Sequence, residues 1–219
     1  MKAILFGASG MVGQGVLGEC LLNPEVQSVL SIGRSATGQQ HDKLRELIRS
    51  NLLDYSDVQS QLAGFDACFF CLGVSSAGMN EENYRKVTYD LTMAAAETLV
   101  KLNPGMTFIY VSGMGTDSSE RGRVMWARVK GQTENALLRM PFKAVYAMRP
   151  GFIVPQHGVR SKTRLYQAFY DVLGPVMPWL LRVAPGLGTS TEQMGRAMLK
   201  LAKAGGAKHA LENRDINRI

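Results

Sequence analysis

The sequence contains little cysteine. Its three cysteines, Cys20, Cys68 and Cys71, cannot all pair with one another, and small secreted domains held by disulfides are far richer in this residue. Cys68 and Cys71 form a C-x-x-C pattern within an apolar run. An extended strand directs two such side chains to opposite faces, and no second pair of metal ligands follows. Buried free thiols in a reduced, cytoplasmic protein are therefore expected.

Long unbroken hydrophobic runs are also absent. The most apolar late stretch, residues 172–187, contains three prolines and Arg182, which interrupt a helix and would place a charge inside a membrane. Met1 and Lys2 lead directly into a strand-like run that ends at Gly7, a pattern unlike a secretory signal peptide. No integral membrane segment is predicted, and residues 172–187 are interpreted as a helical cap over a pocket.

Charge is not concentrated in any segment. The 25 lysines and arginines exceed the 18 acidic residues and give a formal net charge of +7, but no dense basic run with interleaved aromatic residues indicates nucleic acid as a partner. The excess favours a basic surface that also attracts an anionic cofactor. His41, His157 and His209 have no ligand spacing, so neither a metal site nor a Ser-His-Asp triad is predicted.

Short apolar runs alternate with longer helical patterns through the first two thirds of the chain. Such alternation is typical of βαβ units, and near-continuous hydrophobicity is typical of strands covered on both faces. We therefore expect an α/β fold, a doubly wound parallel Rossmann sheet with a small C-terminal helical cap, in one domain. Strands are expected at 2–6, 27–32, 43–48, 66–72, 107–112 and 143–148, and helices at 11–22, 57–62, 81–102 and 124–139.

The pattern changes after the last of these strands. The Arg-Pro-Gly sequence at 149–151 marks a point where the chain leaves the sheet. Helices are expected near 163–183 and 191–204, followed by a short tail that ends at 210–212. We therefore expect a nucleotide-binding core over 1–150 and a substrate-side cap over 151–219, packed on the carboxyl edge of the sheet.

The first expected strand runs into a glycine-rich turn, Gly7-Ala8-Ser9-Gly10-Met11-Val12-Gly13, which opens a helix. This spacing provides a tight turn, a close approach of backbone to phosphate, and close packing of helix on strand. The N–H groups and dipole of the first helical turn then stabilise a pyrophosphate. The flanking strand and helix are those that the motif requires. The turn therefore predicts a dinucleotide site; the alternative is a turn that only connects strand to helix.

The end of the second expected strand favours NADP over NAD. An NAD-binding unit places an acidic residue there, on the ribose hydroxyls, whereas this chain has Gly33, Arg34 and Ser35. A guanidinium offers a charged fork to the 2′-phosphate of NADP, and Ser35 adds a neutral donor. NADP is the predicted cofactor. A solvent-facing arginine would look the same in the sequence, and this alternative stays open.

Together these segments resemble the short-chain dehydrogenase/reductase superfamily, specifically its atypical, epimerase-like branch and, within it, the Tat-interacting-protein-like oxidoreductases. The likeness spans most of the chain. Besides the glycine turn and residues 33–35, four further segments carry it. They are Cys71-Leu72-Gly73, Val111-Ser112, Val129-Lys130-Gly131-Gln132-Thr133-Glu134 and Arg149-Pro150-Gly151.

The resemblance implies where the cofactor lies. Lys130 is expected on the ribose hydroxyls of the nicotinamide half, Ser112 on a substrate carbonyl and Asn51 near the adenine, while Thr88 stands where relatives often have an active-site Asn. Without this pattern, Ser112 would be a strand-end hydroxyl and Lys130 a solvated helix lysine. The expected cofactor-binding residues are Gly7, Ser9, Gly10, Met11, Val12, Gly13, Arg34, Ser35, Asn51, Cys71, Leu72, Gly73, Val111, Ser112, Lys130, Pro150, Gly151 and Ile153.

The chain departs from this family at the catalytic tyrosine. Relatives place a Tyr four residues before the Lys, and Trp126 stands there in this sequence. An indole is only a donor and cannot exchange a proton as a phenol can. Trp126 either fills the core or closes the nicotinamide pocket by stacking. The other nearby phenols, Tyr84, Tyr89 and Tyr110, are expected to pack on helices or strands.

Two functions follow from this pattern. The first is an NADP(H)-dependent oxidoreductase acting on a small carbonyl compound, with Ser112, Lys130 and Trp126 at its catalytic centre and residues 152–187 enclosing the substrate. Loss of a positioned proton donor lowers rates by about 10²- to 10⁴-fold. The second is a catalytically weak or inactive NADP(H)-binding regulatory module that binds a protein partner. A homodimer is the alternative assembly. A sugar-nucleotide epimerase is disfavoured, because that chemistry also needs the tyrosine.

Overall fold

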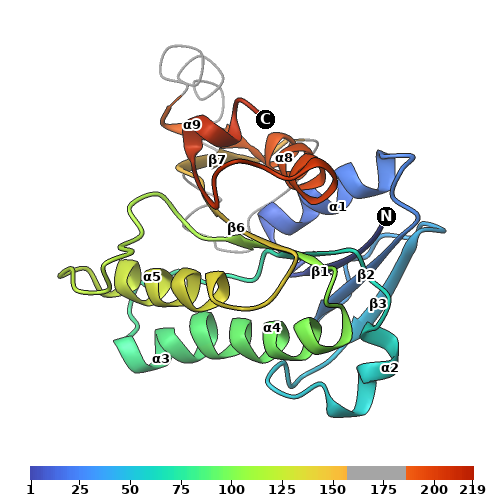
Figure 1. The fold of residues 1–219 in the computed structure, drawn as a ribbon, viewed down its shortest axis with the longest axis horizontal. Coiled ribbons are helices and arrows are strands. Elements are labelled where there is room, and N and C mark those ends of the chain that lie inside the picture. Colours follow the sequence, from blue (N-terminus) through green and yellow to red (C-terminus); the bar gives the residue numbers. More distant parts are fainter. Residues whose placement is uncertain (157–185) are drawn as a thin grey trace.

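The computed structural model describes residues 1–156 and 186–219. In this part of the chain a parallel sheet of seven strands is covered by helices on both faces, in the order β3-β2-β1-β4-β5-β6-β9 (Figure 1). The expected α/β Rossmann fold is therefore confirmed. The strands are β1 (Lys2–Phe6), β2 (Ser28–Gly33), β3 (Leu44–Ile48), β4 (Ala67–Phe70), β5 (Thr107–Val111), β6 (Ala144–Arg149) and β9 (Ala210–Glu212).

Hydrophobicity separates the central strands from the edge strand. All residues of β4 and all but the first residue of β1 are buried, as expected for strands between two helical layers. β3 lies at the edge, where Arg45 and Glu46 are exposed and discourage pairing with another strand. The reversal of strand order lies between β1 and β4, which pair in parallel with Ile4 opposite Cys68. In such sheets, ligands bind at the carboxyl ends beside this switch point.

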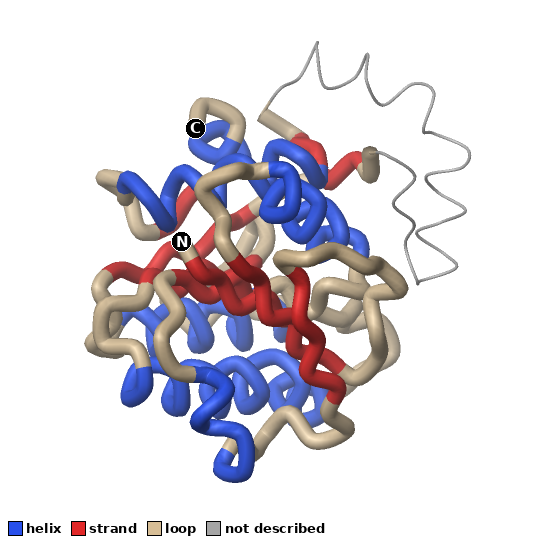
Figure 2. The backbone as a smooth tube through the Cα atoms, turned by 90° about the vertical axis from the view of Figure 1, so that its right-hand side faces the viewer, coloured by secondary structure: helices blue, strands red, loops and turns tan. Residues whose placement is uncertain are grey.

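Two helical layers enclose the sheet (Figures 1 and 2). Helices α1 (Met11–Leu22) and α8 (Thr191–Ala204) cover one face, and α4 (Leu91–Leu102) and α5 (Met125–Leu138) cover the other. Cys68 packs in the α4 and α5 side of the core and Cys71 on the α1 side, so the two thiols face opposite ways as expected. The shorter helices are α2 (Gln59–Leu62), α3 (Glu81–Arg85) and α9 (Asn213–Ile216), with a 3-10 turn at Ser56–Val58.

Helices α1 and α8 approach closely because glycines stand at their contact. A Cβ at Gly15 would lie 2.5 Å from Thr191 Cβ, and one at Gly195 would lie 2.7 Å from Glu19 Cγ. α8 matches the expected helix over 191–204. It is therefore part of the layer that covers the sheet beside the glycine turn.

The expected tail is in fact the seventh strand. β9 pairs in parallel with β6, with Leu211 opposite Met148, so residues 188–219 add a strand and a helix to the core layers and are not only a cap. A separate two-stranded sheet joins β7 (Phe152–Val154) to β8 (Gly188–Ser190). The helix expected near 163–183 lies outside the described residues. Among those described, no helix is long and apolar enough to cross a membrane.

Candidate functional site

The glycine turn between β1 and α1 is closed so tightly that two of its positions exclude a side chain. Gly7 has φ +78°, and a Cβ there would lie 2.9 Å from the backbone of Cys71. A Cβ at Gly13 would lie 2.1 Å from the carbonyl oxygen of Gly7. Gly10 caps α1 without a side-chain hydrogen bond, and the first helical turn has no acidic residue. The helix end therefore presents backbone N–H groups and a positive dipole.

The ends of β2 and β4 flank this turn. The Gly7 N–H donates to the carbonyl oxygen of Ile32 at 3.3 Å, and the Cys71 N–H donates to that of Phe6 at 3.0 Å. Ser35 Oγ donates to Ser9 Oγ at 3.4 Å. The residues after three neighbouring strands thus come together at the carboxyl edge of the sheet.

A cavity of about 210 Å³ opens beside the end of β2. It brings together Arg34 and Asn51, which are far from Gly73 in the sequence but share its lining. Asn51 Oδ1 accepts a hydrogen bond from the Leu53 N–H at 2.9 Å, and this bond fixes the orientation of the Asn51 carboxamide. The complete lining is Arg34, Ser50, Asn51, Leu52, Leu53, Leu72, Gly73, Val74, Val87 and Leu91.

Lys130 projects from α5 toward the end of β5. Its Nζ donates to the carbonyl oxygen of Val111 at 3.4 Å and lies 5.3 Å from the centre of the Tyr110 ring. Burial lowers the pKa of Lys130 to about 8, although Glu134 acts in the opposite direction. Gly131 is required next to it, because a Cβ there would lie 1.8 Å from the carbonyl oxygen of Asp117 in the loop that precedes α5.

Ser112 follows β5 and is buried. Its Oγ lies 3.0 Å from Oγ1 of Thr116, which donates to the carbonyl oxygen of Gly113 at 2.8 Å. Because a hydroxyl has one proton, Thr116 accepts from Ser112 in this arrangement. Ser112 must therefore turn away from Thr116 before it can donate to a substrate carbonyl.

Trp126 occupies the position of the missing phenol, in the first turn of α5. It is half-buried, and its Cη2 lies 3.5 Å from where a Cβ on Gly115 would stand, so the indole faces the loop after β5. Tyr84 and Tyr110 are buried, and burial raises the pKa of both phenols. Tyr89 packs against the Arg85 guanidinium at 4.1 Å. The three phenols pack as expected.

The expected helix over 81–102 is interrupted at Thr88. Residues Lys86–Asp90 form a π-helical segment between α3 and α4, and the carbonyl oxygen of Thr88 accepts from Thr92 Oγ1 at 2.5 Å. π-Helical turns inside α-helices are frequent at functional sites. Hydrophobic periodicity does not register the one extra residue in such a turn, so the sequence did not indicate it.

The segment after β6 is fixed by a residue that the sequence analysis missed. The Met114 N–H donates to the carbonyl oxygen of Pro150 at 2.8 Å, and the Gly151 N–H donates to Asn213 Oδ1 at 3.0 Å. Asn213 is buried and also donates from Nδ2 to the carbonyl oxygen of Gly188 at 2.7 Å. A single Asn near the end of the chain carries no sequence signal for this role. Ile153, in β7, is half-buried.

No metal site is found among residues 1–156 and 186–219, where no three His, Cys, Asp or Glu side chains form a group that could hold an ion. His41 and His209 are both exposed, and His209 stacks on Tyr146 with ring centres 5.7 Å apart. His157 lies outside the described residues. All three cysteines are free thiols.

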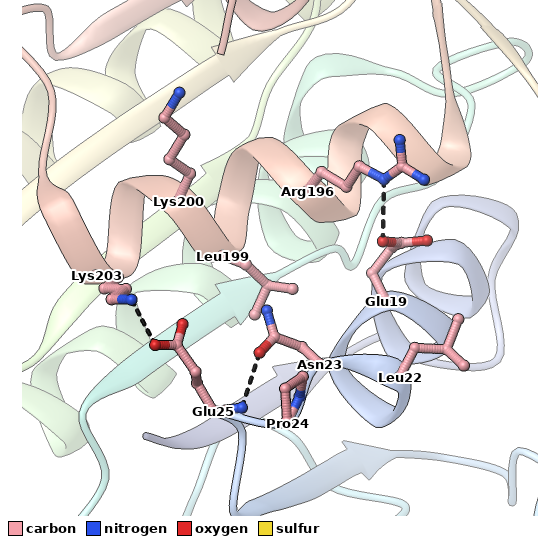
Figure 3. A pocket seen from close by; sticks show the side chains of 9 residues that line it. All are labelled: Glu19, Leu22, Asn23, Pro24, Glu25, Arg196, Leu199, Lys200 and Lys203. Carbon is pink, nitrogen blue, oxygen red and sulfur yellow. Dashed lines mark hydrogen bonds and ion pairs between the residues drawn. The ribbon is translucent and has the colours of Figure 1, made fainter.

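A second hollow, of about 430 Å³, lies between the C-terminal end of α1 and α8 (Figure 3). It is near the amino end of β2 and so is away from the glycine turn. Its charged side chains largely pair with each other: Arg196 Nε lies 3.3 Å from Glu19 Oε2, and Lys203 Nζ lies 2.5 Å from Glu25 Oε1. The lining is Glu19, Leu22, Asn23, Pro24, Glu25, Arg196, Leu199, Lys200 and Lys203.

Sequence comparison finds distant relatives, while no family model matches the chain. The mitochondrial protein FMP52 of Candida albicans is 24% identical over 158 residues, covering 70% of this chain and 68% of the relative. The mitochondrial protein fmp52-2 of Aspergillus terreus is 25% identical over 229 residues, covering 99% and 96%. The expected cytoplasmic location was wrong, since these relatives are named as mitochondrial proteins.

Solved structures share the fold at low sequence identity. A short-chain dehydrogenase family protein of Francisella tularensis matches with a TM-score of 0.65 and 14% identity, covering 96% of this chain and 95% of its own. The carbonyl reductase Sniffer of D. melanogaster matches with a TM-score of 0.66 and 12% identity, covering 98% and 96%. The Bordetella bronchiseptica enzyme WbmH, solved with NAD+, has a TM-score of 0.67 and 17% identity, covering 96% and 73%. These likenesses show that the chain shares the fold of short-chain dehydrogenases and of related NAD-binding enzymes.

Proposed function

We propose that this chain, which has the NAD(P)-binding Rossmann fold of the short-chain dehydrogenases/reductases and epimerases, binds NADP(H) and acts as an oxidoreductase on a small carbonyl compound. One observation carries the proposal. The glycine turn is closed so that Gly13 excludes a Cβ, and the end of β2 meets it through the contact between Ser35 and Ser9.

The turn fits a pyrophosphate by its chemistry. Gly10 leaves the first turn of α1 without a side-chain cap, and no acidic side chain stands in that turn. An anion there is stabilised by backbone N–H groups and by the helix dipole. We assign Gly7, Ser9, Gly10, Met11, Val12 and Gly13 to this role.

The cavity beside the end of β2 fits the adenosine half of NADP. Its lining includes Arg34 and has no acidic residue, whereas a site built for NAD would present a carboxylate to the ribose. Arg34 would pair with the 2′-phosphate, with Ser35 as a second donor. Asn51, Leu72 and Gly73 would border the base.

An Arg34→Asp variant tests this assignment. Its carboxylate repels a 2′-phosphate and accepts from ribose hydroxyls, so we expect the Kd for NADP+ to rise roughly 10- to 100-fold while that for NAD+ falls. Calorimetric titration measures both constants. Arg45→Asp, on the exposed edge strand β3, makes the same charge change and should leave both unchanged. Equal weakening of both cofactors by Arg34→Asp would show that Arg34 does not face the ribose.

On the nicotinamide side, Lys130 would hold the ribose hydroxyls, while Val111, Pro150, Gly151 and Ile153 would line the ring. The chemistry that a bound nicotinamide would supply is hydride transfer to or from a carbonyl carbon. Ser112 would bind the carbonyl oxygen after turning from Thr116, and the balancing proton would come from this hydroxyl or from water. Because position 126 holds Trp and not Tyr, the site has no phenol to donate a proton. We therefore expect turnover about 10²- to 10⁴-fold below that of an enzyme with a positioned donor.

The proposed oxidoreductase activity is tested by measuring steady NADPH consumption with a panel of aldehydes, ketones and quinones. We expect slow turnover with at least one compound, and a Lys130→Met variant should lose it. Tight cofactor binding without turnover of any compound in the panel would contradict the proposed oxidoreductase activity. The protein would then be a cofactor-binding protein without this activity.

A second candidate is a catalytically weak or inactive module that reports NADP(H) to a protein partner. Trp126 in the place of the phenol favours it, together with a Ser112 proton already engaged by Thr116. Immobilised chain should then capture a partner from cell extract differently with and without NADPH. Identical capture in both conditions would exclude this candidate.

Trp126→Tyr tests whether the site is complete except for its proton donor. The phenol would restore an acid four residues before Lys130, so we expect NADPH oxidation to rise about 100-fold or more. Trp126→Phe removes the indole without adding a hydroxyl and is the matched control. Equal rates in the two variants would show that residue 126 does not reach the reacting carbonyl.

A further inference from the structure

A buried carboxylate lies one helical turn beyond Lys130. Glu134 has a side chain only 1% exposed, and its Oε2 lies 2.5 Å from Nη2 of Arg149 at the end of β6. The Arg149 Nε also donates to both carboxylate oxygens, at 3.1 and 3.2 Å. A buried carboxylate with a bidentate guanidinium is held in one orientation.

Arg149 has partners besides Glu134. Its Nη1 donates to Glu212 Oε1 on β9 at 3.0 Å, and its Nη2 donates to Ser118 Oγ at 2.5 Å. Two carboxylates therefore share one guanidinium. With Lys130 counted, the cluster has two cations and two anions, and the charge of Arg149 is divided between Glu134 and Glu212 while Glu134 also acts on the lysine.

The surroundings of Lys130 contain no other described carboxylate that acts on it. The groups that act on it are the Tyr110 ring on β5 and Glu134 on its own helix α5, while Tyr84 of α3 acts on Tyr110 and Arg149 of β6 binds the carboxylate. Burial raises the pKa of both phenols, so they are uncharged at neutral pH. Residues four apart on a helix are neighbours.

We propose that Glu134, oriented by Arg149, is a positioning residue that keeps Lys130 charged and directed toward the end of β5. Burial alone would favour the neutral amine. The carboxylate opposes that effect, while the guanidinium prevents it from folding onto the lysine as a closed ion pair. Lys130 can then donate hydrogen bonds to the carbonyl oxygen of Val111. Under the function proposed above, it would also donate to the ribose hydroxyls.

Titration of Lys130 itself tests this without any cofactor. Lysines are labelled by reductive ¹³C-methylation, the Lys130 signal is assigned with Lys130→Arg, and its midpoint is followed by NMR. We expect Glu134→Gln to lower that midpoint by about one pH unit or more. The control is Glu81→Gln, which removes a carboxylate on α3 that pairs with Arg128, a residue on the same helix as Lys130. This variant should leave the Lys130 midpoint unchanged.

A second variant keeps the test decisive if Glu134→Gln fails to fold. Glu134→Leu combined with Arg149→Met replaces the buried pair by apolar side chains, a change that is often tolerated, and it should lower the Lys130 midpoint similarly. A midpoint equal to the wild-type value in a folded Glu134 variant would overturn the proposal. Because the readout needs no NADP, this result is independent of cofactor binding: a lowered midpoint in a chain that binds no NADP would support the positioning role and contradict only the proposed function.

Discussion

A Gly13→Ala variant should lose cofactor binding and much of its stability. The added Cβ would lie 2.1 Å from the carbonyl oxygen of Gly7, so the turn must open and the first N–H groups of α1 must move. Overpacking of this kind costs about 1–3 kcal/mol. We expect the midpoint of urea unfolding to fall and the Kd for NADP+ to rise at least about 100-fold, since the anion site is built from these backbone groups.

Gly18→Ala is the matched control in the same helix. A Cβ at Gly18 would meet no atom within 4 Å, and alanine favours a helix over glycine by about 1 kcal/mol. This variant should unfold at a higher urea concentration and bind NADP+ as the wild type does. If Gly13→Ala behaved like Gly18→Ala, the turn would not be the close backbone contact that the structure shows.

Removing Arg149 should have the largest effect on stability. Arg149→Ala leaves Glu134 buried without its guanidinium and frees the ends of β6 and β9, which Arg149 joins through Glu212. Breaking a buried pair by deleting one partner costs about 3–5 kcal/mol. Urea unfolding of the purified variant measures the loss of unfolding free energy.

Lys86→Ala is the control for Arg149. Lys86 pairs with Glu82, but both side chains are more than half exposed, and such surface pairs contribute about 0–1 kcal/mol. Loss of a similar small amount by Arg149→Ala would show that the buried network does not hold the sheet edge together.

Strong local patterns predicted most of the core. β1, α1 and α8 lie where periodicity and the glycine turn indicated, because buried strands and amphipathic helices carry their period in the sequence. The glycines had a physical reason visible in advance: the turn needs positive φ at Gly7 and close packing at Gly13. Six of the seven parallel strands lie at or near the expected positions, and one strand is an addition.

That addition, β9, could not be predicted because three residues have no readable period. Within residues 151–219, which were expected to form a substrate-side cap, β9 and α8 complete the core layers. Long-range contacts were equally hidden. The links from Arg149 to Glu134 and Glu212, and from Asn213 to Gly151, join segments that are distant in the sequence.

The residues of the proposed site could be placed at one edge of the sheet from the sequence, but their hydrogen bonds could not be predicted. The engagement of Ser112 by Thr116 and the π-helical segment at Thr88 depend on backbone geometry that composition does not determine. The expected location was wrong for a different reason: free thiols indicate a reducing environment but do not distinguish between compartments. The mitochondrial relatives supplied that correction.

Trp126 separates binding from catalysis in this protein. In the proposed site the glycine turn, Arg34 and Lys130 would hold the cofactor, and Trp126 stands where relatives place the catalytic phenol. Rate measurements on Trp126 variants therefore report on the reaction, while the cofactor constants report on the site itself.

Calorimetric titration of the wild-type chain with NADP+ and with NAD+ tests the central claim most directly. We expect NADP+ to bind at least about tenfold more tightly than NAD+, since one charge-assisted pair with the 2′-phosphate contributes roughly 1.5–3 kcal/mol. Tighter binding of NAD+, or heat from neither nucleotide, would contradict the account.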